Sequence, residues 1–300
     1  MNASFVELPN ALMAHLIGQY GDPQKIDHLG GHTRALVRCV WFEQKSLVIK
    51  ATSNDREVSF YGTIAPVLRK EGVPIPDLEW IHREAEHSWM LVLEHIPLKL
   101  PRDRWLADPE ILQALFRLHT YSGRQQTDSV FHPVWSDEMT AGAASYFPEP
   151  IKEKLQHLLD QMRIKAVHLL EPLCWISGDP NPTNWGLRLN DQAILFDWER
   201  FGRGHPALDL AITIPGLGRE ADFHRVAAEY LKGRLGDNEG VMQLSRDIAL
   251  AKTWTVVEFL HEVRSGVTRD GIELDWLLSS LPQWLIHVGG IVGLSSAADR

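Results

Sequence analysis

The sequence predicts an α+β protein with a two-lobed fold. A small strand-rich N-terminal lobe, residues 1–95, precedes a larger and mainly helical C-terminal lobe, residues 96–300. Two runs rich in β-branched and aromatic residues, LVRCVWF and SLVIK, lie within the first hundred residues. Apolar residues at helical spacing dominate the remainder. The 44% of hydrophobic residues supply enough apolar material for sizeable cores.

In the N-terminal lobe, we expect a helix at about 7–20, followed by the two strand-forming runs within 26–51. Apolar side chains at helical spacing predict a second helix at 54–70. GVPIPDLEW predicts an extended connector, because its two prolines exclude a regular helix. WMLVLEHIP then predicts a buried strand that closes the lobe near residues 94–97.

In the C-terminal lobe, apolar spacing predicts helices separated by one hairpin. These helices are expected at 109–121, at 137–170 with an interruption at Pro148 and Pro150, and at 206–214, 219–235, 241–265 and 272–289. No stretch of about 18 apolar residues occurs, so we expect no membrane-spanning helix.

The hairpin is predicted from NWGLRLNDQAILFDWER, in which apolar residues flank Asn190 and Asp191. If these two form the turn, Asn184 lies opposite Asp197, with Cβ atoms about 4.5–5.5 Å apart. Asp179 adds a second carboxylate five positions before Asn184, on a loop stiffened by prolines. Such hard oxygen ligands suit Mg²⁺, although an ordinary surface turn also explains each of these residues singly.

The overall composition argues against several other classes of protein. The formal net charge is −9, whereas nucleic-acid-binding proteins usually carry a basic surface, so we expect no nucleic-acid partner. The N-terminus lacks a basic start followed by an apolar core, so it does not resemble a signal peptide. Only Cys39 and Cys174 are present, which favours a reducing cytoplasm and no disulfide framework.

The segments SGDPNPTNWG, ILFDWE and GHPALDLA resemble the catalytic core of the aminoglycoside phosphotransferase and choline kinase family. LVIK, REVSFY, VPIPDLEW and LVLEH occur in the order expected for that family, so the resemblance covers most of the chain. It implies a small-molecule kinase with a protein-kinase-like fold. Such an enzyme would use Mg²⁺ and ATP, with GTP also open, to phosphorylate a hydroxyl of an amino sugar, a choline-like amine, a sugar or a related metabolite or antibiotic.

The resemblance implies that Asp179 is the catalytic carboxylate that orients the acceptor hydroxyl and accepts its proton. Asn184 and Asp197 would hold Mg²⁺ on the nucleotide phosphates, in agreement with their predicted opposition in the hairpin. Structural roles in a turn or at a strand end remain the alternatives for all three. Asp209 falls where the family has an acid that fixes the backbone of the catalytic loop.

The resemblance also implies a nucleotide site in the N-terminal lobe. Lys50 would contact the α- and β-phosphates, with Glu57 as its ion-pair partner. A lysine at the end of a surface strand, and a capping pair between Asn54 and Glu57, are the structural alternatives. Gly30 and Gly31 would let backbone amides approach the phosphates, but no full GxGxxG is present and a plain turn also fits.

Residues 94–96, here called the linker, would meet the adenine through their backbone, which makes Glu94 and Ile96 candidate nucleotide-binding residues. For the acceptor, Glu258 and Glu262 share a helical face with Trp254 and could bind a cationic or sugar-like molecule.

A half-buried helix face with solvated edges explains the same spacing and is the favoured interpretation of these acceptor residues. Glu199 could assist metal or substrate binding, and an exposed acid at a strand end is its alternative.

One residue departs from the family pattern. The family usually has histidine directly before the Gly-Asp pair, where this chain has Ser177. The shorter hydroxyl cannot span the same hydrogen bonds, so we expect altered positioning of the loop, and whether activity is lowered stays open. A catalytically silent kinase-like module that binds nucleotide, or serves interactions, is the alternative function, and a metal-dependent hydrolase is a third. The acceptor and the oligomeric state are not predictable from the sequence.

Overall fold

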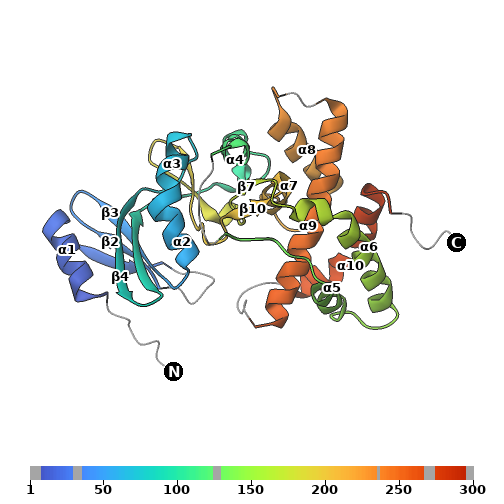
Figure 1. Cartoon of the computed structure of the whole chain (residues 1–300), viewed down its shortest axis with the longest axis horizontal. Coiled ribbons are helices and arrows are strands. Elements are labelled where there is room, and N and C mark those ends of the chain that lie inside the picture. The colour runs from blue at the N-terminus through green and yellow to red at the C-terminus, as the bar shows by residue number, and fades with distance from the viewer. Residues whose placement is uncertain (1–7, 30–35, 124–129, 235–236, 267–273, 295–300) are drawn as a thin grey trace.

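The computed structural model describes residues 8–29, 36–123, 130–234, 237–266 and 274–294. Figure 1 shows an N-terminal lobe built around a sheet and a C-terminal lobe built mainly of helices, which confirms the predicted α+β, two-lobed class. Among the described residues, no helix is long and apolar enough to cross a lipid bilayer.

The N-terminal lobe contains an antiparallel sheet of five strands in the order β1-β2-β3-β5-β4. The strands are β1 Lys25–His28, β2 Val37–Trp41, β3 Ser46–Thr52, β4 Leu78–Ala85 and β5 Ser88–Glu94. Helix α1, Asn10–Tyr20, buries Leu12 and Leu16 against one face of this sheet, together with Leu47, Ile49 and Val92.

The predicted second helix is present, with a π-helical turn inside it. It consists of α2 Asp55–Ser59, the π-helical turn η1 Phe60–Ile64 and α3 Ala65–Lys70. The predicted connector is extended, but its last three residues already belong to β4, a strand that the sequence analysis did not identify. β4 is an edge strand with two register irregularities and no alternation of buried and exposed residues, so it lacks the usual pattern of a strand.

The C-terminal lobe confirms the predicted helices to within a few residues. They are α4 Pro109–Thr120, α5 Asp137–Ala144, α6 Ile151–Lys165, α7 Pro206–Ile212, α8 Glu220–Leu231, α9 Asn238–Arg264 and α10 Leu274–Ile291. Short 3₁₀ turns are η2 Arg102–Arg104, η3 Val167–Leu170 and η4 Pro182–Asn184. The long α9 packs against α5, α7 and α8 and forms the centre of the lobe.

Two small sheets lie between the strand-rich lobe and these helices. One pairs β7 Cys174–Ile176 with β10 Gly202–Gly204, and the other orders β6 Leu98–Lys99, β8 Trp185–Leu187 and β9 Ala193–Leu195 as β6-β8-β9. β5 ends at Glu94, the first residue of the linker, and β6 begins after the linker at Leu98. On this basis we propose that the boundary between the lobes falls between residues 95 and 96.

The predicted hairpin is present as β8 and β9, but its predicted register is wrong by one residue. Trp185 pairs with Leu195, and the amide of Phe196 donates to the carbonyl of Asn184 at 3.0 Å. Phe196, and not Asp197, therefore lies opposite Asn184. The turn has three residues and ends at Asp191, which has a φ of 67°, and turns of two and three residues accept the same Asn-Asp sequence.

Candidate active site

The loop of residues 177–184 connects β7 to β8 and is anchored on α7. The buried carboxylate of Asp209 accepts hydrogen bonds from the amides of Ser177 at 2.8 Å and Gly178 at 2.9 Å. Gly178 has a φ of 81°, and a Cβ there would lie 2.2 Å from the carbonyl oxygen of Arg200. Only glycine fits this position, so the loop has one well-defined path immediately before Asp179.

A buried histidine extends this anchor to two further helices. His119 on α4 contacts the Asp209 carboxylate through Nε2 at 3.1 Å and the Tyr230 hydroxyl of α8 through Nδ1 at 2.9 Å. The Ser177 hydroxyl is buried and has no hydrogen-bond partner among the described residues. The family resemblance implied the contact of Asp209 with the loop, but the sequence offers no signal for its link to His119 and Tyr230, because these residues lie far apart along the chain.

Asp179 lies at the end of this anchored segment. The side-chain nitrogen Nδ2 of Asn184 donates to Oδ2 of Asp179 at 2.9 Å and to the backbone carbonyl oxygen of Asp179 at 3.0 Å. Burial raises the pKa of Asp179 to about 6, although the Arg200 guanidinium lowers it, and the nearby Asp197 carboxylate adds to the rise. A carboxylate with this pKa is mostly ionised at neutral pH and able to accept a proton.

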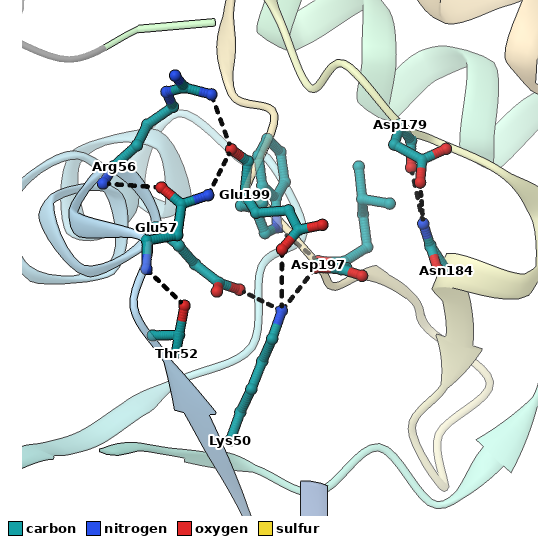
Figure 2. Close-up of polar contacts among 11 residues, drawn as sticks. Lys50, Thr52, Arg56, Glu57, Asp179, Asn184, Asp197 and Glu199 are labelled. Atoms are coloured by element: carbon teal, nitrogen blue, oxygen red, sulfur yellow. Dashed lines mark hydrogen bonds and ion pairs between the residues drawn. The ribbon is translucent and has the colours of Figure 1, made fainter. Parts of the chain in front are cut away.

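Lys50 reaches from β3 toward the C-terminal lobe (Figure 2). Its ammonium nitrogen lies 2.8 Å from Glu57 Oε1 on α2 and 2.7 Å from Asp197 Oδ1. Glu57 is fully buried, and burial raises its pKa to about 7 while Lys50 opposes the shift. Burial lowers the pKa of Lys50, but the two carboxylates outweigh this and raise it above its usual value. The Lys50–Glu57 ion pair is therefore present.

Asn54 caps α2, because its side-chain oxygen accepts from the backbone amide of Arg56.

Glu199 ties α2 to the segment that follows β9. Its carbonyl oxygen accepts from the side chains of Asn54 and Arg56, each at 3.2 Å. Its carboxylate lies 4.0 Å from the Lys50 ammonium group. Glu199 is thus close to the proposed phosphate site, while its backbone joins the two lobes.

The donor atoms of Asn184 and Asp197 fit a hard divalent cation. The Asn184 nitrogen is engaged by Asp179, so the amide oxygen is the atom left for a metal, and Asp197 adds a carboxylate. Figure 2 shows Asp197 between Lys50 and the Asp179–Asn184 pair. Within the described ranges, no group of three or more His, Cys, Asp and Glu side chains could hold a metal ion. A cation here would therefore need phosphate oxygens and water, as Mg²⁺ commonly does.

The predicted acceptor residues have partners inside the protein. Arg200 lies 2.6 Å from Glu258 and 3.7 Å from Glu262, and its guanidinium stands 4.4 Å over the ring of Phe131. Trp254 is buried, and its indole donates to the backbone carbonyl of Val134 at 2.9 Å. Sequence reasoning missed Arg200, because its acidic partners are on α9, about sixty positions away.

The remaining predicted nucleotide residues are Gly30, Gly31, Glu94 and Ile96. Gly30 and Gly31 lie outside the described residues. The Glu94 carboxylate is bound by Arg188 of the hairpin at 2.6 Å, and Ile96 lies against Gly186 of β8. The structure therefore places the linker directly on the hairpin that also carries Asn184.

The strand-rich lobe carries a lysine–glutamate pair, and the helical lobe carries the loop of Asp179 and Asn184 that Asp209 holds in place. Together these features are those of a small-molecule kinase with a protein-kinase-like fold. The chain belongs to the phosphotransferase enzyme family, whose family model matches residues 40–244. No curated protein sequence matches the chain significantly.

Solved structures with the same fold include three phosphotransferases of this type. Choline kinase LicA from Streptococcus pneumoniae is 15% identical with a TM-score of 0.60, and the alignment covers 93% of this chain and 98% of LicA. A GDP complex of aminoglycoside 2'-phosphotransferase-IIIa is 16% identical with a TM-score of 0.63, covering 94% and 99%. Spectinomycin phosphotransferase with ADP and spectinomycin is 14% identical with a TM-score of 0.61, covering 96% and 98%.

Proposed function

We propose that the protein transfers the γ-phosphate of ATP to a hydroxyl of a small molecule in a Mg²⁺-dependent reaction. The observation that carries this proposal is the position of Lys50, which is bound to both Glu57 and Asp197 beside the Asp179–Asn184 pair. This position brings an ammonium group together with carboxylates of both lobes, and such groups would suit phosphoryl transfer.

In the proposed mechanism, Asp179 accepts the proton of the acceptor hydroxyl and orients its oxygen toward the γ-phosphate. The anchored loop supplies the positioning, which contributes much of the acceleration in phosphoryl transfer. Lys50 would neutralise charge on the α- and β-phosphates, and Glu57 holds the lysine in place. Asn184 and Asp197 would hold Mg²⁺, which neutralises phosphate charge when bound.

The nucleotide would lie between the lobes, with its base at the linker and Gly30 and Gly31 near its phosphates. Similar structures contain AMP, ADP or GDP, which supports a nucleotide site and leaves GTP open beside ATP. Two free cysteines and a nucleotide substrate favour the cytoplasm as the site of action.

For the acceptor, we propose a hydroxyl-bearing molecule that is cationic or sugar-like. Similar structures are a choline kinase and enzymes bound to kanamycin or spectinomycin, and this chain carries a formal charge of −9. Glu199, Glu258 and Glu262 are the acidic candidates for this site. Because Arg200 pairs with the last two, a cationic acceptor would share or replace the guanidinium there.

The test measures ADP release from Mg²⁺-ATP with a panel of amino sugars, choline-like amines, sugars and amino alcohols. Release that depends on the acceptor, and that falls at least about 100-fold in Asp179→Asn while nucleotide binding survives, supports the proposal. Nucleotide binding without turnover for any acceptor would favour a silent module. Cleavage of phosphate esters without nucleotide would favour a hydrolase.

A further inference from the structure

The carboxylate of Glu94, at the end of β5, is held by a two-pronged contact from the hairpin. Arg188 donates from Nε to Oε1 and from Nη2 to Oε2, each at 2.6 Å. The side chains of Arg188 and Glu94 are 28% and 21% exposed. Such parallel, charge-assisted bonds fix orientation as well as distance, so the start of the linker is tied to the hairpin of the other lobe.

A second contact brings the linker onto the same hairpin. A Cβ at Gly186 of β8 would lie 2.8 Å from Cγ2 of Ile96 and 2.9 Å from the carbonyl oxygen of Leu98. β6 continues this contact, since Leu98 pairs with Leu187 and Lys99 with Gly186. The linker therefore contacts β8 through the Ile96 side chain, and the backbone of β6 pairs with β8 directly after it.

The same strand also leads to the proposed metal site. β8 runs from Trp185 to Leu187, so Asn184 precedes it and Arg188 follows it. Four residues of extended chain span about 13 Å. One hairpin thus contacts the linker toward its turn end and carries Asn184, a proposed metal ligand, at its open end.

We propose that Arg188 is a positioning residue of the nucleotide site, which acts through Glu94 to hold the linker backbone where it meets the nucleobase. This inference rests on the proposed function, because it assumes that a nucleotide binds with its base at the linker. Arg188 contacts neither the phosphate-facing residues nor Asp179 among the contacts described for it. Loss of the Arg188 side chain should therefore lower the affinity for the nucleobase and leave the affinity for the phosphates unchanged.

The test compares Arg188→Gln with the wild-type full-length protein by calorimetric titration of adenosine and, separately, of Mg²⁺ tripolyphosphate. Glutamine keeps the polar stem but removes the charge and the two-pronged geometry. We expect adenosine affinity to fall about tenfold and tripolyphosphate affinity to change less than about twofold. Lys99→Gln is the matched control, because it removes an exposed positive charge from neighbouring β6 and should alter neither affinity.

A second variant tests the route through Glu94. Glu94→Gln removes the same charged contact and keeps a side-chain oxygen that can accept from the Asp77 amide, which donates to Glu94 Oε2 at 3.1 Å. It should weaken adenosine binding similarly, and the double variant should be no weaker than Arg188→Gln. Equal weakening of adenosine and tripolyphosphate, or unchanged adenosine affinity, would overturn the inference. A wild-type protein that binds no Mg²⁺-ATP would overturn the proposed function together with the inference, so the two failures are distinguishable.

Discussion

Asp179 and Arg200 show how a single charge can adjust the proposed catalytic carboxylate. Burial and Asp197 raise the pKa of Asp179, and Arg200 opposes both. Arg200 also forms ion pairs with Glu258 and Glu262. One guanidinium therefore acts electrostatically on three carboxylates. This arrangement links α9, where the acceptor is proposed to bind, with the group proposed to accept the acceptor's proton.

The pH dependence of activity follows from this arrangement. Because Asp179 must be ionised to accept a proton, kcat/KM should fall as the pH decreases through about 6, the pKa given by its surroundings. Arg200→Gln removes a cation that lowers this pKa, so the acid limb should move to higher pH. The measurement is kcat/KM from pH 5 to 9 for both proteins with an acceptor found in the panel. An acid limb that stays in place or moves to lower pH in the variant would contradict this role of Arg200.

Ser177 contributes to the site through its backbone amide and not through its side chain. Its amide is held by Asp209, while its buried hydroxyl is without a partner in the described part of the chain. The anchoring of the loop therefore depends on Asp209 and His119, and it does not require a particular side chain at position 177.

At the scale of elements, the turn of the β8–β9 hairpin determines which residues face each other at its open end. A two-residue type I′ turn would need positive φ at both Asn190 and Asp191. Only Asp191 of the two has positive φ. The three-residue turn moves Phe196 opposite Asn184 and places Asp197 one position further along, where Lys50 reaches it.

This turn predicts a contrast between two neighbouring alanine substitutions. Asp191→Ala should lower the free energy of unfolding by about 1 kcal/mol, because a Cβ without a local hydrogen-bonding group is disfavoured at positive φ. Asn190→Ala should cost less than about 0.5 kcal/mol, since only a weak side-chain contact to Gln192 is lost. Urea denaturation of both variants gives these values. Equal losses would favour the two-residue turn and the other register.

At the scale of the whole molecule, the two lobes meet through aromatic packing as well as through ions. Phe60 of η1 stacks on Trp198 at a centroid distance of 4.4 Å, and Phe201 lies 4.8 Å from Phe60 and 5.0 Å from Trp175 of β7. These rings are buried, and Trp198 directly follows Asp197 in the chain. The candidate site is therefore one unit that spans both lobes.

A ligand that contacts both lobes should stabilise the whole chain. At a hundredfold excess over Kd, Mg²⁺-ATP should add about 2.7 kcal/mol to the free energy of unfolding. Asp197→Asn should lose the part of this gain that depends on Mg²⁺, because a proposed metal ligand loses its charge. Thermal unfolding with ATP in Mg²⁺ or in EDTA measures both effects, with Mg²⁺ alone as the control. Equal stabilisation with and without Mg²⁺ in the wild type would argue against the proposed metal site.

Local patterns in the sequence are sufficient to predict most helices, the central strands of the first lobe, the hairpin and the two-lobed class. This succeeds because helical spacing and β-branched runs depend on residues close together in the chain. The same reasoning missed the edge strand β4, whose exposure does not alternate. The segments around Lys50, Asp179 and Asp197 also carried the family resemblance, which the family match confirms.

Contacts between distant segments are not contained in such patterns. The pairing of Arg200 with α9, of Arg188 with Glu94, and of His119 with Asp209 joins residues about sixty to ninety-five positions apart. Each of these depends on how whole elements pack, and several other charged residues could have satisfied the same side chains. The hairpin register likewise follows from one backbone angle at Asp191, which the Asn-Asp sequence permits but does not require.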